Sequence, residues 1–339
     1  MTDTRKDTRI PVTVLTGFLG AGKTTLLNRI LREQHGHRIA VIENEFGEVG
    51  IDDALLVDSP DEQIVVMNNG CICCTVRGDL IRILGELAER KASGRFDFER
   101  VIIETTGLAD PAPVAQTFFV DETILNLYRL DSVLTVVDTL HGNVQLDQHH
   151  EALEQVGFAD RLLLTKVDLC DEATTRALEL RLRSINSRAP IKRVHLDTGE
   201  LGELLDIRGF NLNDILAIEP DFLGEDHHQH DDAVKSFVIR ESRPYNSDRL
   251  EQAIGLLVEK YGANLLRYKG ILCMAGNPHK VAFQGVHMIM GGDNFRLWRN
   301  DELRESMMVF IGRDLPEAEF RAAFAACTED AAVMEALPS

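Results

Sequence analysis

The sequence predicts an α/β protein whose main domain is a mostly parallel β-sheet flanked by helices, followed by a smaller C-terminal α+β domain. Apolar or alternating runs recur up to about residue 195, with helix-periodic segments between them, which is the pattern of a parallel α/β sheet. From residue 234 onward, strand-like runs outnumber helical segments, which indicates hairpins. At 339 residues, the chain is long enough for two domains.

The elements of the first domain follow from the same patterns. We expect strands at Val12–Leu15, Arg38–Ile42, Ile64–Met67, Val101–Ile103, Ser132–Val137, Leu162–Leu164 and Ile191–His195. We expect helices near Thr24–Glu33, Asp79–Lys91, Asp147–Gln155 and Glu172–Asn186. Open α/β sheets bind ligands at the carboxyl ends of their strands. Those ends carry Gly17, Glu43, Cys71, Glu104, Asp138 and Lys166-Val167-Asp168.

A polar stretch, EPDFLGEDHHQHDD, interrupts the pattern. We interpret residues 219–233 as a linker between a first domain at 1–218 and a second at 234–330. In the second domain we expect strands at Val234–Arg240, Leu265–Met274, Lys280–Met290 and Met307–Ile311, and helices at Ser247–Lys260 and Glu317–Cys327. The linker residues His227, His228 and His230 either bind metal weakly or belong to a flexible polar segment.

The composition narrows the class of protein. The formal net charge of −19 argues against nucleic-acid or anionic-membrane partners, because phosphate groups would be repelled. The N-terminal MTDTRKDTR lacks an apolar signal region, and no apolar run is long enough to span a bilayer. Six cysteines, three of them within four residues, do not form a secreted disulfide framework. We therefore expect a cytoplasmic protein.

A phosphate-binding loop is predicted at GFLGAGKT, residues 17–24, which lies between a strand and a helix. Its glycines let backbone N–H groups point at phosphate oxygens, and the helix adds its positive N-terminal end. Lys23 would reach the β- and γ-phosphates, and the Thr24 hydroxyl would bind Mg²⁺. The alternative is a glycine-rich turn without a ligand. The predicted nucleotide contacts in this loop are Gly17, Phe18, Leu19, Gly20, Ala21, Gly22, Lys23, Thr24 and Thr25.

A second nucleotide motif is VIIETTG, residues 101–107. Its acidic residue is Glu104, which would hold Mg²⁺ directly or through water, and the Gly107 N–H can sense the γ-phosphate. The alternative is a buried strand that ends in a polar turn. Because a phosphate loop precedes it, we favour the nucleotide function.

Base recognition is predicted at LLLTKVD, residues 162–168, which fits the [NT]-K-x-D loop of GTPases. The Asp168 carboxylate would accept hydrogen bonds from guanine N1–H and the 2-amino group, and Lys166 would lie along the base. Adenine offers neither donor at these positions, so it would leave polar atoms unpaired. Thr165 stands where asparagine is usual. By itself, this short motif is as consistent with an ordinary loop as with base recognition.

Three cysteines, Cys71, Cys73 and Cys74, follow a predicted strand and precede a predicted helix. Cys71 and Cys73 share a side of an extended backbone, whereas Cys73 and Cys74 do not. Thiolates select metals such as Zn²⁺ or Cu⁺. Buried structural cysteines, a redox pair and a closed zinc site are the alternatives, although a closed site usually needs a second spaced pair. Cys170, Cys273, Cys327 and His149-His150 are interpreted as fold or surface residues.

The acidic segment ENEFGEVGID, residues 43–52, lies between the phosphate loop and the cysteines, where a switch loop is expected. Its carboxylate oxygens could bind the same metal ion as the thiolates. A solvated acidic loop is the alternative.

Taken together, GFLGAGKTT, ENEFGEVGID, NGCICC, VIIETTG and LLTKVD make this chain similar to the CobW-type P-loop GTPases, a family of proposed metallochaperones. DPAPVAQTFF, LLRYKGIL, FQGVH and SMMVFIGRDLP extend the resemblance over nearly the whole chain. The resemblance implies a GTPase domain, a CobW-type C-terminal domain and slow GTP hydrolysis. It also implies a Zn²⁺ site, with Co²⁺ and Ni²⁺ as alternatives, whose ligands are Glu43, Glu48 and Cys73, with Cys71 and Cys74 nearby.

The sequence therefore predicts a GTP-dependent zinc chaperone that uses Mg²⁺, in which Lys23, Thr24 and Glu104 carry hydrolysis and a client metalloprotein receives the metal. One alternative is a metal or redox sensor in which GTP turnover is incidental. Another is a small-molecule kinase, against which the base-recognition motif argues. The client, the physiological metal and the oligomeric state stay open, with a homo-oligomer among the options.

Overall fold

A computed structural model of the chain describes residues 8–32, 38–43, 56–59, 62–65, 76–195, 234–299 and 302–329. The chain divides into two compact units, Met1–Glu179 with Ala189–Gly209 and Leu180–Arg188 with Phe210–Ser339. The first contains a six-stranded sheet and the second a five-stranded sheet. Among the described residues, every helix is too short or too polar to traverse a bilayer.

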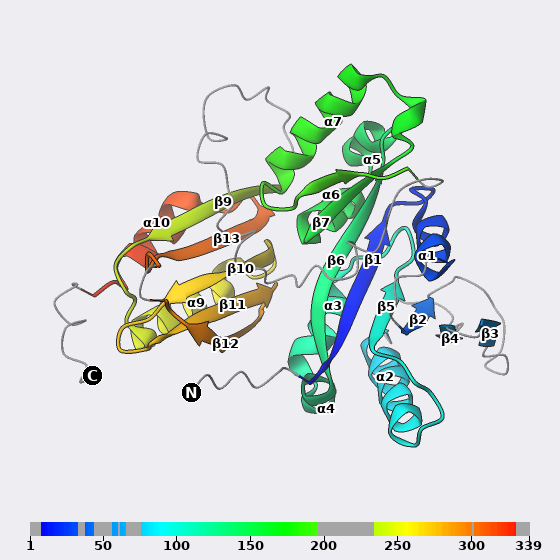
Figure 1. Cartoon of the computed structure of the whole chain (residues 1–339). Helices are drawn as coiled ribbons and strands as arrows, with labels where there is room; N and C mark the ends of the chain where they lie inside the picture. The colour runs from blue at the N-terminus through cyan, green and yellow to red at the C-terminus, as the bar shows by residue number, and fades with distance from the viewer. Residues whose placement is uncertain are drawn as a thin grey trace. The chain divides into compact units, whose positions relative to one another are not determined.

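The sheet of the first unit is entirely parallel, which confirms the predicted fold class. Its strand order is β2-β5-β1-β6-β7-β8, so β1 lies in the interior of the sheet between β5 and β6 (Figure 1). The strands are β1 (Ile10–Gly17), β2 (Ile39–Glu43), β5 (Arg100–Glu104), β6 (Tyr128–Asp138), β7 (Arg161–Thr165) and β8 (Ile191–Arg193). The carboxyl ends of β1, β5 and β7 carry the three predicted nucleotide motifs.

The helices of this unit follow the strands along the chain. They are α1 (Lys23–Arg32), α2 (Val76–Ala92), α3 (Ala112–Val120), α4 (Glu122–Leu127), α5 (Gly142–Gln148) and α6 (His150–Phe158), with a 3₁₀ turn η1 (Val167–Leu169). Helix α7 (Glu172–Ile185) begins in this unit, and its residues from Leu180 onward belong to the second unit. Leu26, Leu27, Ile30 and Leu31 form the buried stripe of α1 and join the core of the sheet. This spacing of apolar residues is typical of a helix that covers a sheet.

Three features of the helices differ from the prediction. The single helix expected at Asp147–Gln155 is two helices, because His149 is extended and ends α5 before α6 begins. Helices α3 and α4 were not predicted. The α3 sequence APVAQTFFV is apolar on nearly all sides, so it lacks the one-sided periodicity that identifies a surface helix.

The predicted strand Ile64–Met67 was wrongly assigned to the parallel sheet. The structure has β4 (Glu62–Val65) paired antiparallel with β3 (Leu56–Ser59) in a separate two-stranded sheet. Only two residues separate these strands. A connection this short allows an antiparallel hairpin, whereas parallel strands need a crossover of about a dozen residues or more.

The second unit is an antiparallel sheet with the strand order β12-β11-β10-β13-β9. Its elements are β9 (Val234–Glu241), α9 (Ser247–Tyr261), β10 (Leu265–Cys273), β11 (His279–Val286), β12 (Ile289–Leu297), β13 (Ser306–Arg313) and α10 (Glu317–Ala325). Apolar residues of both helices pack against one face of the sheet. There the centroids of the Phe310 and Phe320 rings lie 5.0 Å apart.

One predicted strand of this unit, Lys280–Met290, is in fact the hairpin β11–β12. His287 has a φ of 52°, and Val286 pairs with Ile289 across the two-residue turn. The residues of the turn are neither glycine nor proline, so the sequence carries no turn signal there.

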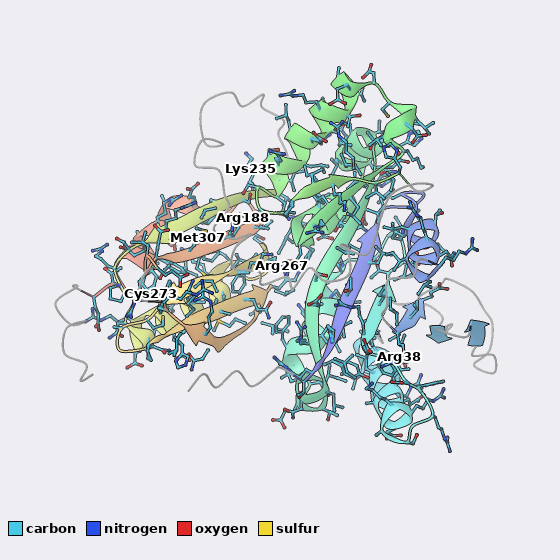
Figure 2. All side chains as sticks on the ribbon, in the orientation of Figure 1. Arg38, Arg188, Lys235, Arg267, Cys273 and Met307 are labelled. Atoms are coloured by element: carbon cyan, nitrogen blue, oxygen red, sulfur yellow. The ribbon has the colours of Figure 1, made fainter. Side chains whose placement is uncertain are left out.

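The cysteines of the second unit belong to its core. Cys273 and Met307 lie on the neighbouring strands β10 and β13 (Figure 2) and pack with Trp298. Cys273 and Cys327 are both buried, and burial raises the pKa of both thiols.

Candidate nucleotide-binding site

The phosphate loop runs from the end of β1 to the start of α1. Gly17 has a φ of 145°, and a Cβ atom there would lie 2.3 Å from the Val136 carbonyl oxygen on β6. Any side chain would therefore push the two strands apart. The loop then delivers Lys23 to the first position of α1, where the N–H groups of the first helical turn can face an anion. Phe18 and Ala21 are buried, whereas Leu19, Gly20, Thr24 and Thr25 are exposed.

Lys23 is the cation of this loop, and only 8% of it is exposed. Its Nζ donates to the carbonyl oxygens of Gly17 at 2.9 Å and Phe18 at 3.3 Å. Burial lowers the pKa of Lys23, and the charge of Glu104 acts in the opposite direction. A largely desolvated ammonium group interacts more strongly with phosphate oxygens than an exposed one does.

The second motif meets the phosphate loop directly. Glu104 is buried at the end of β5, beside Leu15 of β1, and its Oε1 accepts a hydrogen bond of 2.7 Å from the Thr24 hydroxyl. The structure thus brings together a hydroxyl and a carboxylate from two motifs 80 positions apart. Oxygen ligands of these kinds suit Mg²⁺, so the residues present fit the predicted ion.

The loop after β5 is fixed at its first residue. Thr105 donates from its N–H to the Leu15 carbonyl oxygen at 2.9 Å and from its hydroxyl to that of Thr16 at 2.8 Å. Two residues later, Gly107 lies against Leu19 of the phosphate loop, because a Cβ atom on Gly107 would be 2.7 Å from the Leu19 backbone nitrogen. The backbone of the predicted γ-phosphate sensor therefore lies beside the phosphate loop.

The third motif also reaches the phosphate loop. Lys166 adopts a left-handed conformation, with a φ of 56°, and its Nζ donates to the Gly20 carbonyl oxygen at 2.8 Å. The Thr165 hydroxyl donates to the Ala21 carbonyl oxygen at 2.7 Å. Thr165 thus braces the loop despite replacing the usual asparagine. Asp168 lies in η1 and is exposed, which leaves its carboxylate open to a base.

Two residues of the site had no role in the sequence-based prediction. The buried carboxylate of Asp138, at the end of β6, accepts from Lys166 Nζ at 2.6 Å and from the N–H groups of Leu140 and His141 at 2.9 and 3.2 Å. It therefore ties the base-recognition motif to the start of α5. Gln155 reaches the loop after β5 from α6. Only the strand-end position of Asp138 was a signal in the sequence.

The predicted metal site is only partly within the described residues. Glu43 ends β2 and pairs in register with Glu104 of β5. Glu48, Cys71, Cys73 and Cys74 lie outside the described residues, as do the linker histidines. In the part of the chain that the structure describes, no group of three or more His, Cys, Asp or Glu side chains is arranged to hold a metal ion. The metal ligands therefore stay a prediction.

Comparison with known proteins shows which family has this sequence and this arrangement of motifs. Residues 11–193 match the family model for the CobW/HypB/UreG nucleotide-binding domain, and residues 234–328 match the cobalamin synthesis protein cobW C-terminal domain. The zinc chaperone YjiA of Escherichia coli strain K12 is 45% identical over 317 residues, which cover 93% of this chain and 98% of that protein.

A more distant relative and a solved structure also match most of this chain. The zinc-regulated GTPase metalloprotein activator 1 of Dictyostelium discoideum is 34% identical, with 86% of this chain and 69% of that protein covered. The crystal structure of Zn(II)-bound YjiA GTPase from E. coli matches with a TM-score of 0.73 and 40% identity, and the match covers 95% of this chain and 99% of that one.

Proposed function

This chain belongs to the CobW/HypB/UreG nucleotide-binding family and is a GTPase, and we propose that it is a zinc chaperone in which GTP hydrolysis controls the bound metal. The observation that carries this proposal is the pairing of Glu43 with Glu104 on adjacent strands. Glu104 belongs to the nucleotide site through Thr24, and Glu43 begins the segment that leads to the predicted zinc ligands.

The geometry of the site supports hydrolysis of GTP to GDP and phosphate. Lys23 and the N–H groups of the phosphate loop hold the β- and γ-phosphates, and Asp168 with Lys166 holds the guanine. Thr24 and Glu104 would hold Mg²⁺, which neutralises charge on the phosphate oxygens when bound. Gly107, beside Leu19, would contact the γ-phosphate through its N–H.

The zinc cargo would be bound by thiolate and carboxylate ligands drawn from Glu43, Glu48, Cys71, Cys73 and Cys74. These ligand types are the ones that Zn²⁺ takes in proteins. Support comes from the zinc chaperone that is 45% identical to this chain. A client metalloprotein would receive the ion when hydrolysis changes the segment after Glu43.

The test of this function is whether nucleotide and zinc affinities are coupled. We expect Zn²⁺ to bind more tightly with a non-hydrolysable GTP analogue than with GDP, by about 5- to 150-fold, which is the range of typical couplings. Zn²⁺ must then raise the affinity for the analogue over GDP by the same factor. Both affinities can be measured by buffered competition titration. Equal Zn²⁺ affinities with the analogue, with GDP and without nucleotide would contradict a chaperone mechanism.

A second prediction concerns the ligand set. Replacing Cys73 with alanine should weaken Zn²⁺ binding at least about tenfold, because a thiolate ligand is lost. Cys170 is the matched control: burial, and then the nearby carboxylates of Asp138, Asp171 and Asp168, raises the pKa of its thiol and makes it a poor ligand. In a chelator competition assay, Cys170→Ala should match the unmodified protein. A loss in Cys170→Ala equal to that in Cys73→Ala would show that the predicted ligands are wrong.

A further inference from the structure

Gln155 is a buried residue whose side-chain amide donates hydrogen bonds next to the nucleotide site. It lies on α6 and is 1% exposed. Its Nε2 donates to two backbone carbonyl oxygens of the loop after β5, those of Gly107 and Ala109, each at 3.1 Å. A single side chain therefore satisfies two carbonyl groups of the loop that contains the predicted γ-phosphate sensor.

The chemistry of these contacts fixes the orientation of the amide. Both partners are carbonyl oxygens, which only accept hydrogen bonds, so the NH₂ group and not the oxygen of Gln155 must face them. The two protons of this group match the two acceptors in number. Methionine, a side chain of similar length, would leave both carbonyl groups without this donor.

The other end of Gln155 is held by the central sheet. The backbone carbonyl oxygen of Gln155 accepts a hydrogen bond of 2.8 Å from the buried Thr135 hydroxyl on β6. The loop itself is tied to β1 through Thr105 at its start. Thr105 and Gln155 thus hold the loop on either side of the Gly107 N–H, and Gly107 lies against the Leu19 backbone of the phosphate loop.

We propose that Gln155 is a positioning residue for recognition of the γ-phosphate: it holds the loop at residues 107–109 so that the Gly107 N–H is already beside the phosphate loop when GTP binds. This inference rests on the proposed GTPase function. Lys23 and Asp168 contact parts of the nucleotide that GDP also has, whereas the loop after β5 meets only the γ-phosphate. Loss of the Gln155 contacts should therefore affect GTP and spare GDP.

The test compares the two nucleotides in Gln155→Met. We expect the affinity for a non-hydrolysable GTP analogue to fall about tenfold, because two hydrogen bonds that position the loop are lost, while the affinity for GDP stays within about twofold. Isothermal titration with Mg²⁺ present measures both. The matched control is Thr175→Val, which removes a hydrogen bond of 3.0 Å from the buried Thr175 hydroxyl on α7 to the Asp171 carbonyl oxygen just before that helix. Its preference for the analogue over GDP should be unchanged.

A second variant separates positioning from a purely structural effect. In Gln155→Glu, we expect burial to raise the pKa of the new carboxyl group, and the protonated acid can donate one hydrogen bond to the loop. The preference for the GTP analogue should recover partly as the pH falls from about 8 to about 6, whereas Gln155→Met should show no recovery.

Equal weakening of GDP and the analogue in Gln155→Met, no weakening of either, or no recovery in Gln155→Glu would overturn the inference. If the unmodified protein binds GDP and the analogue but does not hydrolyse GTP, the proposed function fails on its own. The nucleotide comparison at Gln155 then still decides the positioning role.

Discussion

Replacing Lys23 with alanine should reduce GTP hydrolysis by about a hundredfold or more, and triphosphate affinity by about tenfold or more. The Lys23 ammonium is largely buried and is held by two carbonyl oxygens of the phosphate loop. Its charge would therefore act on bound phosphates with little screening by water. Alanine removes the compensating charge, and the loss grows as negative charge develops in the transition state. Phosphate release measures the hydrolysis rate, and titration measures the affinity.

The control for Lys23→Ala is Lys235→Ala. Lys235 is exposed on β9 of the second unit (Figure 2), so its removal changes the net charge equally and leaves every residue of the three nucleotide motifs in place. Its hydrolysis rate should equal that of the unmodified protein, and both variants should unfold cooperatively on heating. A Lys23→Ala protein that folds and still hydrolyses GTP at the original rate would show that residues 17–24 do not bind the phosphates.

The parts of the site that the sequence could predict are those whose residues are contiguous. The phosphate loop, the VIIETTG segment and the base-recognition loop each carry a glycine or a charged residue at a fixed spacing after a strand. Parallel strands then bring their ends to one edge of the sheet, and the contact of Thr24 with Glu104 follows from that rule.

The roles of the supporting residues were not predictable, because their partners lie far away along the chain. Asp138 contacts Lys166 across 28 positions, and Gln155 contacts Gly107 across 48. An aspartate at a strand end and a glutamine in a helix are both ordinary surface residues in a sequence. Only the three-dimensional arrangement shows that these two are buried and hydrogen-bonded to the nucleotide motifs.

The pairing of strands was the other feature that the sequence could not predict. The apolar pattern at Ile64–Met67 indicated a strand correctly, but a pattern of side chains does not say which neighbour the backbone pairs with. The structure pairs this region with β3 in a hairpin and leaves it out of the parallel sheet. The length of the connection was the decisive information, and it becomes useful only after β3 has been recognised.

Replacing Asp168 with asparagine should change the base preference of the protein from guanine toward xanthine. The Asp168 carboxylate would accept hydrogen bonds from guanine N1–H and the 2-amino group. Asparagine can accept from N1–H, but its NH₂ group opposes the 2-amino group and suits the 2-carbonyl oxygen of xanthine. We expect GTP affinity to fall about a hundredfold and XTP affinity to rise, because an unmatched polar pair in a binding site is costly. Competition against a fluorescent nucleotide measures both.

The effect of Asp168→Asn should be specific, because the neighbouring groups that hold the motif are unchanged. Thr165 braces the loop through Ala21, and Asp138 holds Lys166, so the new amide should occupy the position of the carboxylate. Asp171→Asn is the control: it removes a nearby charge, yet its amide oxygen can still accept the 2.7 Å hydrogen bond from the Thr174 N–H. Its preference for GTP over XTP should be unaltered. If the unmodified protein binds ATP as tightly as GTP, or if Asp171→Asn shifts the preference as much as Asp168→Asn does, Asp168 does not read the base.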